Sequence, residues 1–106
     1  MELLTTVKGT ALSKGKARTW LELPQSKLAG FGFARGNRID VSFGSTGIDV
    51  TVNEKGARKV AGRVKPDGTV ICILDLCCSL EQRAAMFNGS ERVSVYVDNG
   101  KLEFRA

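Results

Sequence analysis

Residues 37–52, which read NRIDVSFGSTGIDVTV, decide the fold class of this chain. Apolar and polar side chains alternate over 39–43 and again over 48–52, on either side of a glycine-bounded turn at 44–47. Strict alternation is typical of half-buried strands, because successive side chains of a strand point to opposite faces of a sheet. Two such runs around a short turn predict a β-hairpin, and we therefore expect a mainly β protein.

A second hairpin is predicted over residues 93–104, where apolar residues alternate around a turn at 99–100. It repeats the first hairpin at a constant spacing, which relates Ile39 to Val93 and Ile48 to Leu102. Any β-rich chain can contain two similar hairpins, but here the strand and the helix that precede each hairpin repeat as well. We therefore interpret the chain as one domain with an internal repeat. The units are the domain 1–106, repeat one at about 17–53, a basic linker at about 54–68 and repeat two at about 69–106.

The segments before the hairpins carry strand and helix signals. Residues 19–24 predict a strand that stops at Pro24, which cannot donate a backbone hydrogen bond. Residues 25–31 predict one or two helical turns ended by Gly30. In the second half, the continuous apolar run at 70–74 predicts a strand that is buried on both faces.

The first strands of the two halves also correspond. Leu21 matches Leu74 and Leu23 matches Leu76, at a spacing one position shorter than the spacing of the hairpins. A single insertion or deletion between strand and hairpin accounts for the difference.

A short helix is predicted after Ser79. Ser79 and Gln82 have the spacing of a capping box, in which the serine side chain accepts a hydrogen bond from the first turn of the helix. We expect this helix to carry Leu80, Ala84 and Phe87 on one side and to end near Asn88 and Gly89.

Four motifs of the first half resemble the AbrB/MazE/SymE swapped-hairpin family. They are LELP at 21–24, LAGF at 28–31, GNRIDV at 36–41 and GIDV at 47–50. The resemblance extends over about 17–106, and the second half is similar to a degenerate copy that lacks the proline.

The SymE-like branch is the most similar, because WLE at 20–22 precedes AGF at 29–31. In this family two copies interlock their hairpins into a small barrel, normally as a homodimer. The resemblance thus implies a mainly β, AbrB-like barrel with short helices, in which both tandem repeats of one chain form a pseudo-dimer. It implies a monomer or a higher homo-oligomer of that unit. Members of the family commonly bind DNA, and some are antitoxins, toxins or appended modules.

Composition argues against catalysis. The chain has 106 residues and no histidine, so it lacks the commonest general base and the commonest metal ligand. Its carboxylates are scattered singly rather than clustered as in metal-dependent nucleases. We expect no catalytic residue, no metal site and no cofactor.

The cysteines predict a reducing environment. Cys72, Cys77 and Cys78 are odd in number and lack the spacing of a zinc site, and we expect Cys72 to lie in the core. Residues 1–8 lack the basic and long apolar regions of a signal peptide, and no apolar stretch approaches the roughly 18 residues of a membrane span. We therefore expect a cytoplasmic protein without a membrane partner.

The positive charge is unevenly distributed. The formal net charge is +5, and residues 1–72 contain twelve bases and six acids, whereas residues 73–106 contain four bases and five acids. Such asymmetry favours a phosphate-binding face. The predicted nucleic-acid-binding residues are Lys14, Lys16, Arg18, Arg35, Arg38, Lys55, Arg58, Lys59, Arg63 and Lys65.

These observations lead to one functional hypothesis and two alternatives. The first is a small nucleic-acid-binding protein, with DNA favoured over RNA, that acts as a transcriptional or mobile-element-associated regulator. The second is a phage- or plasmid-encoded protein-binding inhibitor or antitoxin-like factor, and the third is a SymE-like toxin acting on nucleic acid. A solvated linker is the alternative explanation for the bases of residues 54–68.

Overall fold

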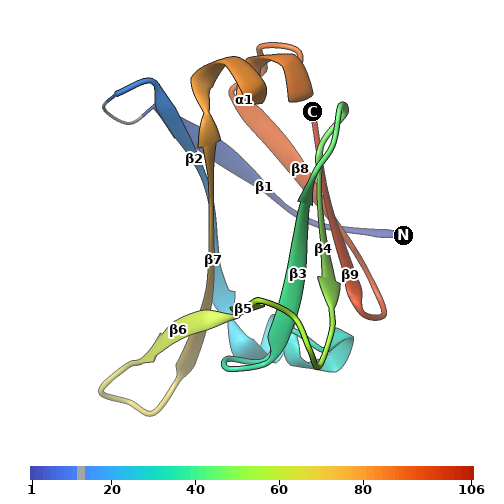
Figure 1. Cartoon of the computed structure of the whole chain (residues 1–106). Coiled ribbons are helices and arrows are strands. Elements are labelled where there is room, and N and C mark those ends of the chain that lie inside the picture. The colour runs from blue at the N-terminus through green and yellow to red at the C-terminus, as the bar shows by residue number, and fades with distance from the viewer. Residues whose placement is uncertain (12–13) are drawn as a thin grey trace.

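Antiparallel strands make up most of the chain in the computed structural model, which describes residues 1–11 and 14–106 (Figure 1). In this part of the chain, two short 3-10 helices and one α-helix interrupt the strands. The elements in chain order are β1 (Glu2–Ala11), β2 (Lys16–Pro24), η1 (Gln25–Lys27), η2 (Ala29–Phe31), β3 (Arg38–Phe43), β4 (Ile48–Val52), β5 (Arg58–Lys59), β6 (Ala61–Val64), β7 (Val70–Ser79), α1 (Leu80–Met86), β8 (Arg92–Asp98) and β9 (Lys101–Arg105).

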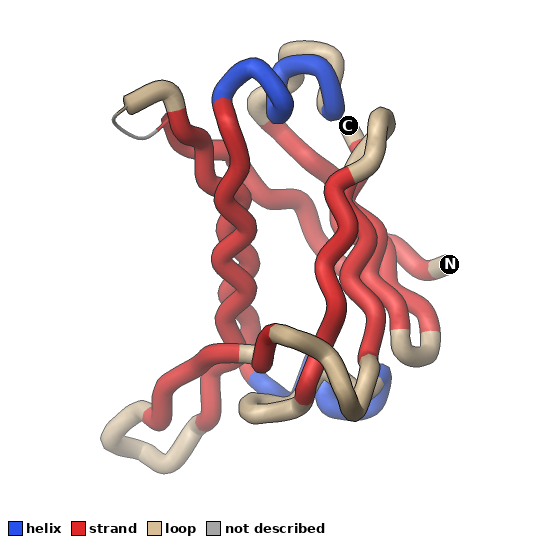
Figure 2. The backbone as a smooth tube through the Cα atoms, viewed as in Figure 1, coloured by secondary structure: helices blue, strands red, loops and turns tan. Residues whose placement is uncertain are grey.

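The described strands form one nine-stranded sheet in the order β5-β3-β4-β9-β8-β1-β2-β7-β6. The chain passes from β5 to β6 across the single residue Val60, so the two edge strands of the sheet are neighbours in sequence. The sheet therefore curls into a nearly closed antiparallel barrel, in which β2 and β7 lie across the core from β3 and β4 (Figure 2). The predicted mainly β class is confirmed.

Both predicted hairpins are present. β3 pairs with β4 around the turn at 44–47, and β8 pairs with β9 around the turn at 99–100. Ile48 and Val50 are buried as their alternation predicts, whereas Val52 is 38% exposed at the last position of β4.

The predicted strand at 19–24 is the second part of β2, which ends at Pro24. The apolar run at 70–74 begins β7, which lies between β2 and β6. Cys72 is buried in the core as predicted, but Ile73 is only half-buried. The prediction of burial on both faces is therefore wrong at this position, because no second layer of the described chain covers the outer face of the barrel wall.

Helix α1 starts as the capping box predicts, since the Ser79 side chain accepts a hydrogen bond from the Gln82 backbone at 3.0 Å. The three apolar residues predicted on one side of the helix differ in burial. Phe87 is buried just beyond the helix, but Leu80 is 42% exposed and Ala84 is exposed as well. The helix is short and covers one end of the barrel, so that its last turn alone reaches the core (Figure 1).

The helical turns expected over 25–31 are η1 and η2, and they cover the other end of the barrel (Figure 1). They end at Gly32 rather than at Gly30. Gly32 has φ of +95° and its backbone N–H donates to Ala29 O at 3.1 Å, which closes the last turn in a conformation that side chains rarely adopt.

Two basic segments, residues 1–18 and the predicted linker at about 54–68, are strands in part. β1 occupies residues 2–11 of the basic segment 1–18, of which residues 12 and 13 lie outside the described residues. Its pairing with β8 shifts register between Leu3 and Thr5, and this irregularity removes the alternation by which a strand is recognised in the sequence. β5 and β6 lie within the predicted linker.

The core fills the barrel between the two ends. Phe33, Phe87 and Phe104 are its largest fully buried side chains, and Phe33 corresponds to Phe87 at the spacing of the two hairpins. Burial of these aromatic side chains and of the aliphatic side chains around them stabilises the closed barrel.

Candidate nucleic-acid interface

Five of the ten predicted bases lie on the two segments that meet where β5 pairs with β3. This pairing places Arg38 opposite Lys59, and the Gly36 N–H donates to Val60 O at 2.9 Å. The segments 35–38 and 55–59 therefore lie side by side. We call this group the β5 cluster, and its members are Arg35, Arg38, Lys55, Arg58 and Lys59.

Hydrogen bonds to backbone carbonyls position two members of the β5 cluster. Arg38 Nη1 donates to Gly56 O at 2.8 Å, and Arg58 Nη2 donates to Asp75 O at 2.8 Å. Neither contact neutralises the positive charge. Within the described residues, no carboxylate oxygen lies within 4.0 Å of a side-chain nitrogen of this cluster.

A cavity of about 650 Å³ lies beside the β5 cluster. Gln25, Arg35 and Lys59 contribute its polar side chains, and no acid of the described residues lines it. Gln25 Oε1 accepts a hydrogen bond from the Arg35 backbone N–H at 2.9 Å and thereby ties η1 to the segment before β3. The cavity is thus positively charged, and the loops around it are anchored.

Two further predicted bases lie on the outer face of β2, β7 and β6, where acids compensate them. Arg18 Nε is 2.9 Å from Asp75 Oδ1, and its guanidinium lies 5.0 Å from the centre of the Trp20 ring. Arg63 donates to both carboxylate oxygens of Glu22 at 3.0 Å. These hydrogen bonds hold the pKa of Glu22 below its usual value. This face therefore carries mixed charge rather than a positive stripe.

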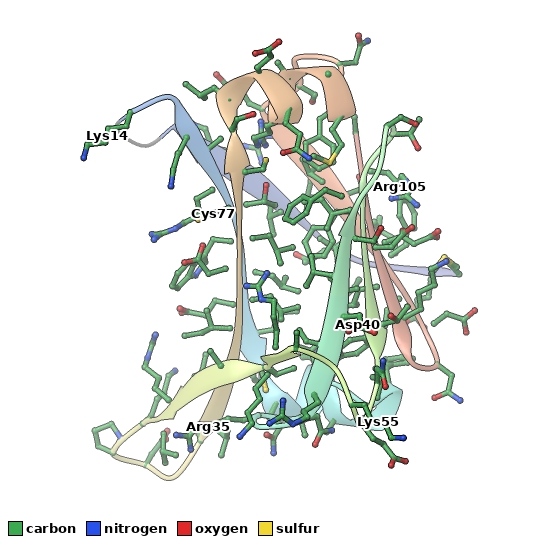
Figure 3. All side chains as sticks on the ribbon, in the orientation of Figure 1. Lys14, Arg35, Asp40, Lys55, Cys77 and Arg105 are labelled. Atoms are coloured by element: carbon green, nitrogen blue, oxygen red, sulfur yellow. The ribbon has the colours of Figure 1, made fainter. Side chains whose placement is uncertain are left out.

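The remaining predicted bases lie at turns. Lys14 precedes and Lys16 begins β2, and Lys65 follows β6. Lys14 lies at the opposite end of the molecule from Arg35 and Lys55 (Figure 3). The ten bases therefore form no single cluster: the antiparallel pairing of β2 with β7 separates the turn before β2 from the turn before β7 by roughly 27 Å, at ~3.3 Å per residue.

Gln25 was not predicted as a site residue, although it lines the cavity and holds Arg35. Its role depends on a contact between two loops, and nothing in the local sequence marks that contact. Asn37 and Gly62, which lie beside the same cluster, were missed for the same reason.

The three cysteines are free thiols that differ in exposure. Cys72 is buried and Cys78 is half-buried, and burial raises the pKa of both thiols, whereas Cys77 is exposed. In residues 1–11 and 14–106, no three His, Cys, Asp or Glu side chains come together as a metal site would require.

Comparison with known proteins finds no family model, no curated protein and no solved structure that matches this chain. Among the described residues, no helix has both the length and the apolar character needed to span a membrane.

Proposed function

We propose that this protein binds nucleic acid, with DNA as the favoured partner, through the β5 cluster. The observation that carries this proposal is that five bases lie on the neighbouring segments 35–38 and 55–59, where no carboxylate of the described residues compensates them. Uncompensated Lys and Arg side chains neutralise phosphates and release counterions from the nucleic acid. Contacts of this kind position the backbone without reading the base sequence.

The resemblance to the AbrB/MazE/SymE family supports the same proposal. It favours a transcriptional or mobile-element-associated regulator whose two repeats form a swapped-hairpin pseudo-dimer. Such a chain would build the barrel as a monomer, with a higher homo-oligomer as the alternative.

The pairing of β2 with β7 supports the pseudo-dimer. Leu21 corresponds to Leu74 in the repeat, and these two residues are direct cross-strand partners. The same correspondence converts the neighbouring pair Leu23–Cys72 into another observed pair, Thr19–Leu76. β2 and its counterpart β7 are therefore antiparallel neighbours, the arrangement that a two-fold axis between corresponding strands produces.

The pairing of β4 with β9 supports it independently. Ile48 pairs with Phe104, and the correspondence between the hairpins converts this pair into the observed pair Val50–Leu102. β4 and its counterpart β9 are thus antiparallel neighbours as well.

The proposal is tested by fluorescence anisotropy with duplex DNA, single-stranded DNA and RNA at several salt concentrations. We expect the wild-type protein to bind duplex DNA at low salt and to lose affinity steeply as salt rises. Lys55→Gln/Lys59→Gln should weaken binding across all sequences. Lys8→Gln/Lys101→Gln is the matched control, because it removes the same charge from exposed lysines outside the β5 cluster. Failure of the wild-type protein to bind at low salt would contradict the proposal.

A protein partner is the second candidate, and the mixed-charge outer face supports it. Trp20 is half-buried there between the Arg18–Asp75 and Arg63–Glu22 ion pairs, and Trp and Arg are enriched at interface hot spots. A tagged chain that captures the same protein from lysate with and without nuclease would favour the inhibitor or antitoxin-like function. Growth arrest on expression would favour the toxin.

A further inference from the structure

We call a corner each place where the chain passes from pairing with one strand to pairing with another: β1 passes from β8 to β2, and β5 and β6 pass from β3 to β7. The two corners correspond to each other in the repeat but differ in charge. At one corner, β1 pairs with β8 through Lys8 and Arg92. At the other, β5 pairs with β3 through Lys59 and Arg38. Arg38 corresponds to Arg92 at the spacing that also relates the two hairpins, so Lys8 and Lys59 hold equivalent positions.

A glycine marks the same point at each corner. Gly9 pairs with Thr19, and Gly62 pairs with Cys72, which corresponds to Thr19 at the spacing that relates Leu21 to Leu74. Neither glycine has room for a side chain. A Cβ atom at Gly62 would overlap the carbonyl oxygen of Ile71, and one at Gly9 would overlap the guanidinium of Arg83.

The corner at β1 and β8 is filled and partly neutralised. The Arg83 side chain lies over Gly9 and donates to the carbonyls of Ser90 at 3.1 Å and Glu91 at 3.3 Å. The Glu91 carboxylate lies 4.0 Å from Lys8 Nζ. A cation of the protein itself thus occupies this corner, and an acid faces the strand lysine.

The corner at β5 and β3 is open and uncompensated. Asn37 stands at the position equivalent to Glu91, so the acid that faces Lys8 has no counterpart beside Lys59 in the described chain. The Arg35 side chain approaches Gly62, with its Cδ 3.1 Å from the place of a Cβ. The cavity of about 650 Å³ lies here, lined by Gln25, Arg35 and Lys59.

We propose that this corner is a phosphate-binding site, in which Arg35, Lys59 and Gln25 bind one phosphate group of a nucleic-acid backbone. The inference rests on the proposed function and names the subsite at which the backbone is held. Its basis is the contrast between the two corners: Arg83 and Lys8 have acceptors within the protein, whereas no acceptor of the described residues holds the guanidinium of Arg35 or the Nζ of Lys59.

The chemistry of the three side chains suits a phosphodiester. The Arg35 guanidinium can donate two parallel hydrogen bonds to phosphate oxygens, and Lys59 adds a point charge. Gln25 Oε1 accepts from the Arg35 N–H, which leaves the amide nitrogen of Gln25 as a third donor. Gly62 also lines the cavity, and the Arg35 side chain packs against it.

The test compares matched single variants in salt titrations with one DNA duplex. Arg35→Gln should lower affinity roughly tenfold at low salt, the effect expected for a lost hydrogen bond to a charged group. It should also reduce the slope of log affinity against log salt by about 0.9, the value for one phosphate. Arg92→Gln is the control, because it removes the same charge near the filled corner.

Neutral methylphosphonate linkages placed one at a time along the duplex identify the contact. We expect one position at which the substitution weakens wild-type binding but not binding by Arg35→Gln or Lys59→Gln. If both variants keep the wild-type slope and the wild-type sensitivity to every linkage, the phosphate site is excluded while nucleic-acid binding stands. If the wild-type protein binds no nucleic acid at all, the proposed function and the site on the backbone are both excluded.

Amide NMR spectra separate a backbone site from a pocket for a free anion. Duplex DNA should shift the signals of Gly36 and Gly62, and inorganic phosphate should shift them only at far higher concentration. Shifts caused by inorganic phosphate but not by DNA would overturn the assignment to a nucleic-acid backbone.

Discussion

Glu22 and Arg63 illustrate how the surroundings of a charged residue decide whether its charge is available to bind a phosphate group. Arg63 lies in the same basic stretch as Lys55 and Lys59, yet it donates two hydrogen bonds to Glu22 across the outer face of the barrel. Its charge is therefore compensated, and we assign phosphate binding to its neighbours. Residue type and spacing alone cannot distinguish these lysines from Arg63, because the compensating acid lies 41 positions away in the chain.

The Glu22–Arg63 pair makes stability depend on pH in the acid range. Hydrogen bonds from Arg63 lower the pKa of Glu22 in the folded state, so the unfolded chain binds more protons there. The stabilisation is present above the unfolded pKa and is lost as pH falls through the folded pKa. Because the pair is exposed, Glu22→Gln should cost roughly 0.2–1 kcal/mol at pH 7 and nearly nothing at pH 2. Urea unfolding at both pH values measures the difference, and an equal cost at both would contradict this account.

The cysteines should differ in both stability and reactivity. Cys72 is completely buried, and its sulfur is 3.8 Å from Gln25 Oε1, too far for a serine hydroxyl at the same place to form a good hydrogen bond. We expect Cys72→Ser to destabilise the fold by roughly 1–3 kcal/mol, and Cys77→Ser to have little effect because Cys77 is exposed. Thermal unfolding measures both. In the folded wild-type protein a thiol reagent should modify Cys77 first, and rapid modification of Cys72 would show that the core is more open than described.

At the scale of elements, the corners of the barrel depend on strands that the sequence pattern did not reveal. β1 pairs with β8 through its first part and with β2 through Gly9 and the residues that follow. At the corresponding place, β5 pairs with β3 and β6 pairs with β7. Pairing with two partners in succession requires a bend, and a bend interrupts the period-two alternation that predicts strands.

The glycines at these bends should respond differently to a methyl group. Gly62→Ala would bring its Cβ against the carbonyl of Ile71, a backbone atom that cannot move without disturbing β7. Gly9→Ala would meet the end of the Arg83 side chain, which can rotate away. We expect Gly62→Ala to destabilise by roughly 1–3 kcal/mol, as overpacking does, and Gly9→Ala by less. Chemical denaturation of the two variants tests the order, and a smaller effect at Gly62 would mean that β6 is loosely held.

Around the whole barrel, groups of strands from one half of the chain alternate with groups of strands from the other half. β2 pairs with β7, β4 with β9 and β1 with β8, so each half supplies partners to the other. Neither half has a core of its own, because the residues of each hairpin face are buried against the other half.

Cleavage in the turn at 66–68 should therefore leave two fragments that do not fold alone. Each isolated fragment should show no cooperative thermal transition, and an equimolar mixture should regain the strand signal in circular dichroism. A fragment that melts cooperatively by itself would contradict the pseudo-dimer. The uncut chain, analysed by sedimentation, reports whether the barrel is a monomer.

The two hairpins, the β2 strand, the helix cap at Ser79 and the core position of Cys72 could all be predicted from the sequence. Each of these features depends on local alternation, turn chemistry or hydrophobicity within a few residues. The candidate basic residues were also identifiable by type, because no other feature of composition is as uneven as their distribution.

Tertiary structure alone decided which of those bases lie together and which are compensated. The pairing of Arg38 with Lys59 creates the β5 cluster, whereas the ion pairs of Arg18 and Arg63 remove two other candidates from it. It also decided that Leu80 points to solvent. These outcomes depend on contacts between residues far apart in the chain, and a charge is neutralised by whatever the fold places beside it rather than by its neighbours in sequence.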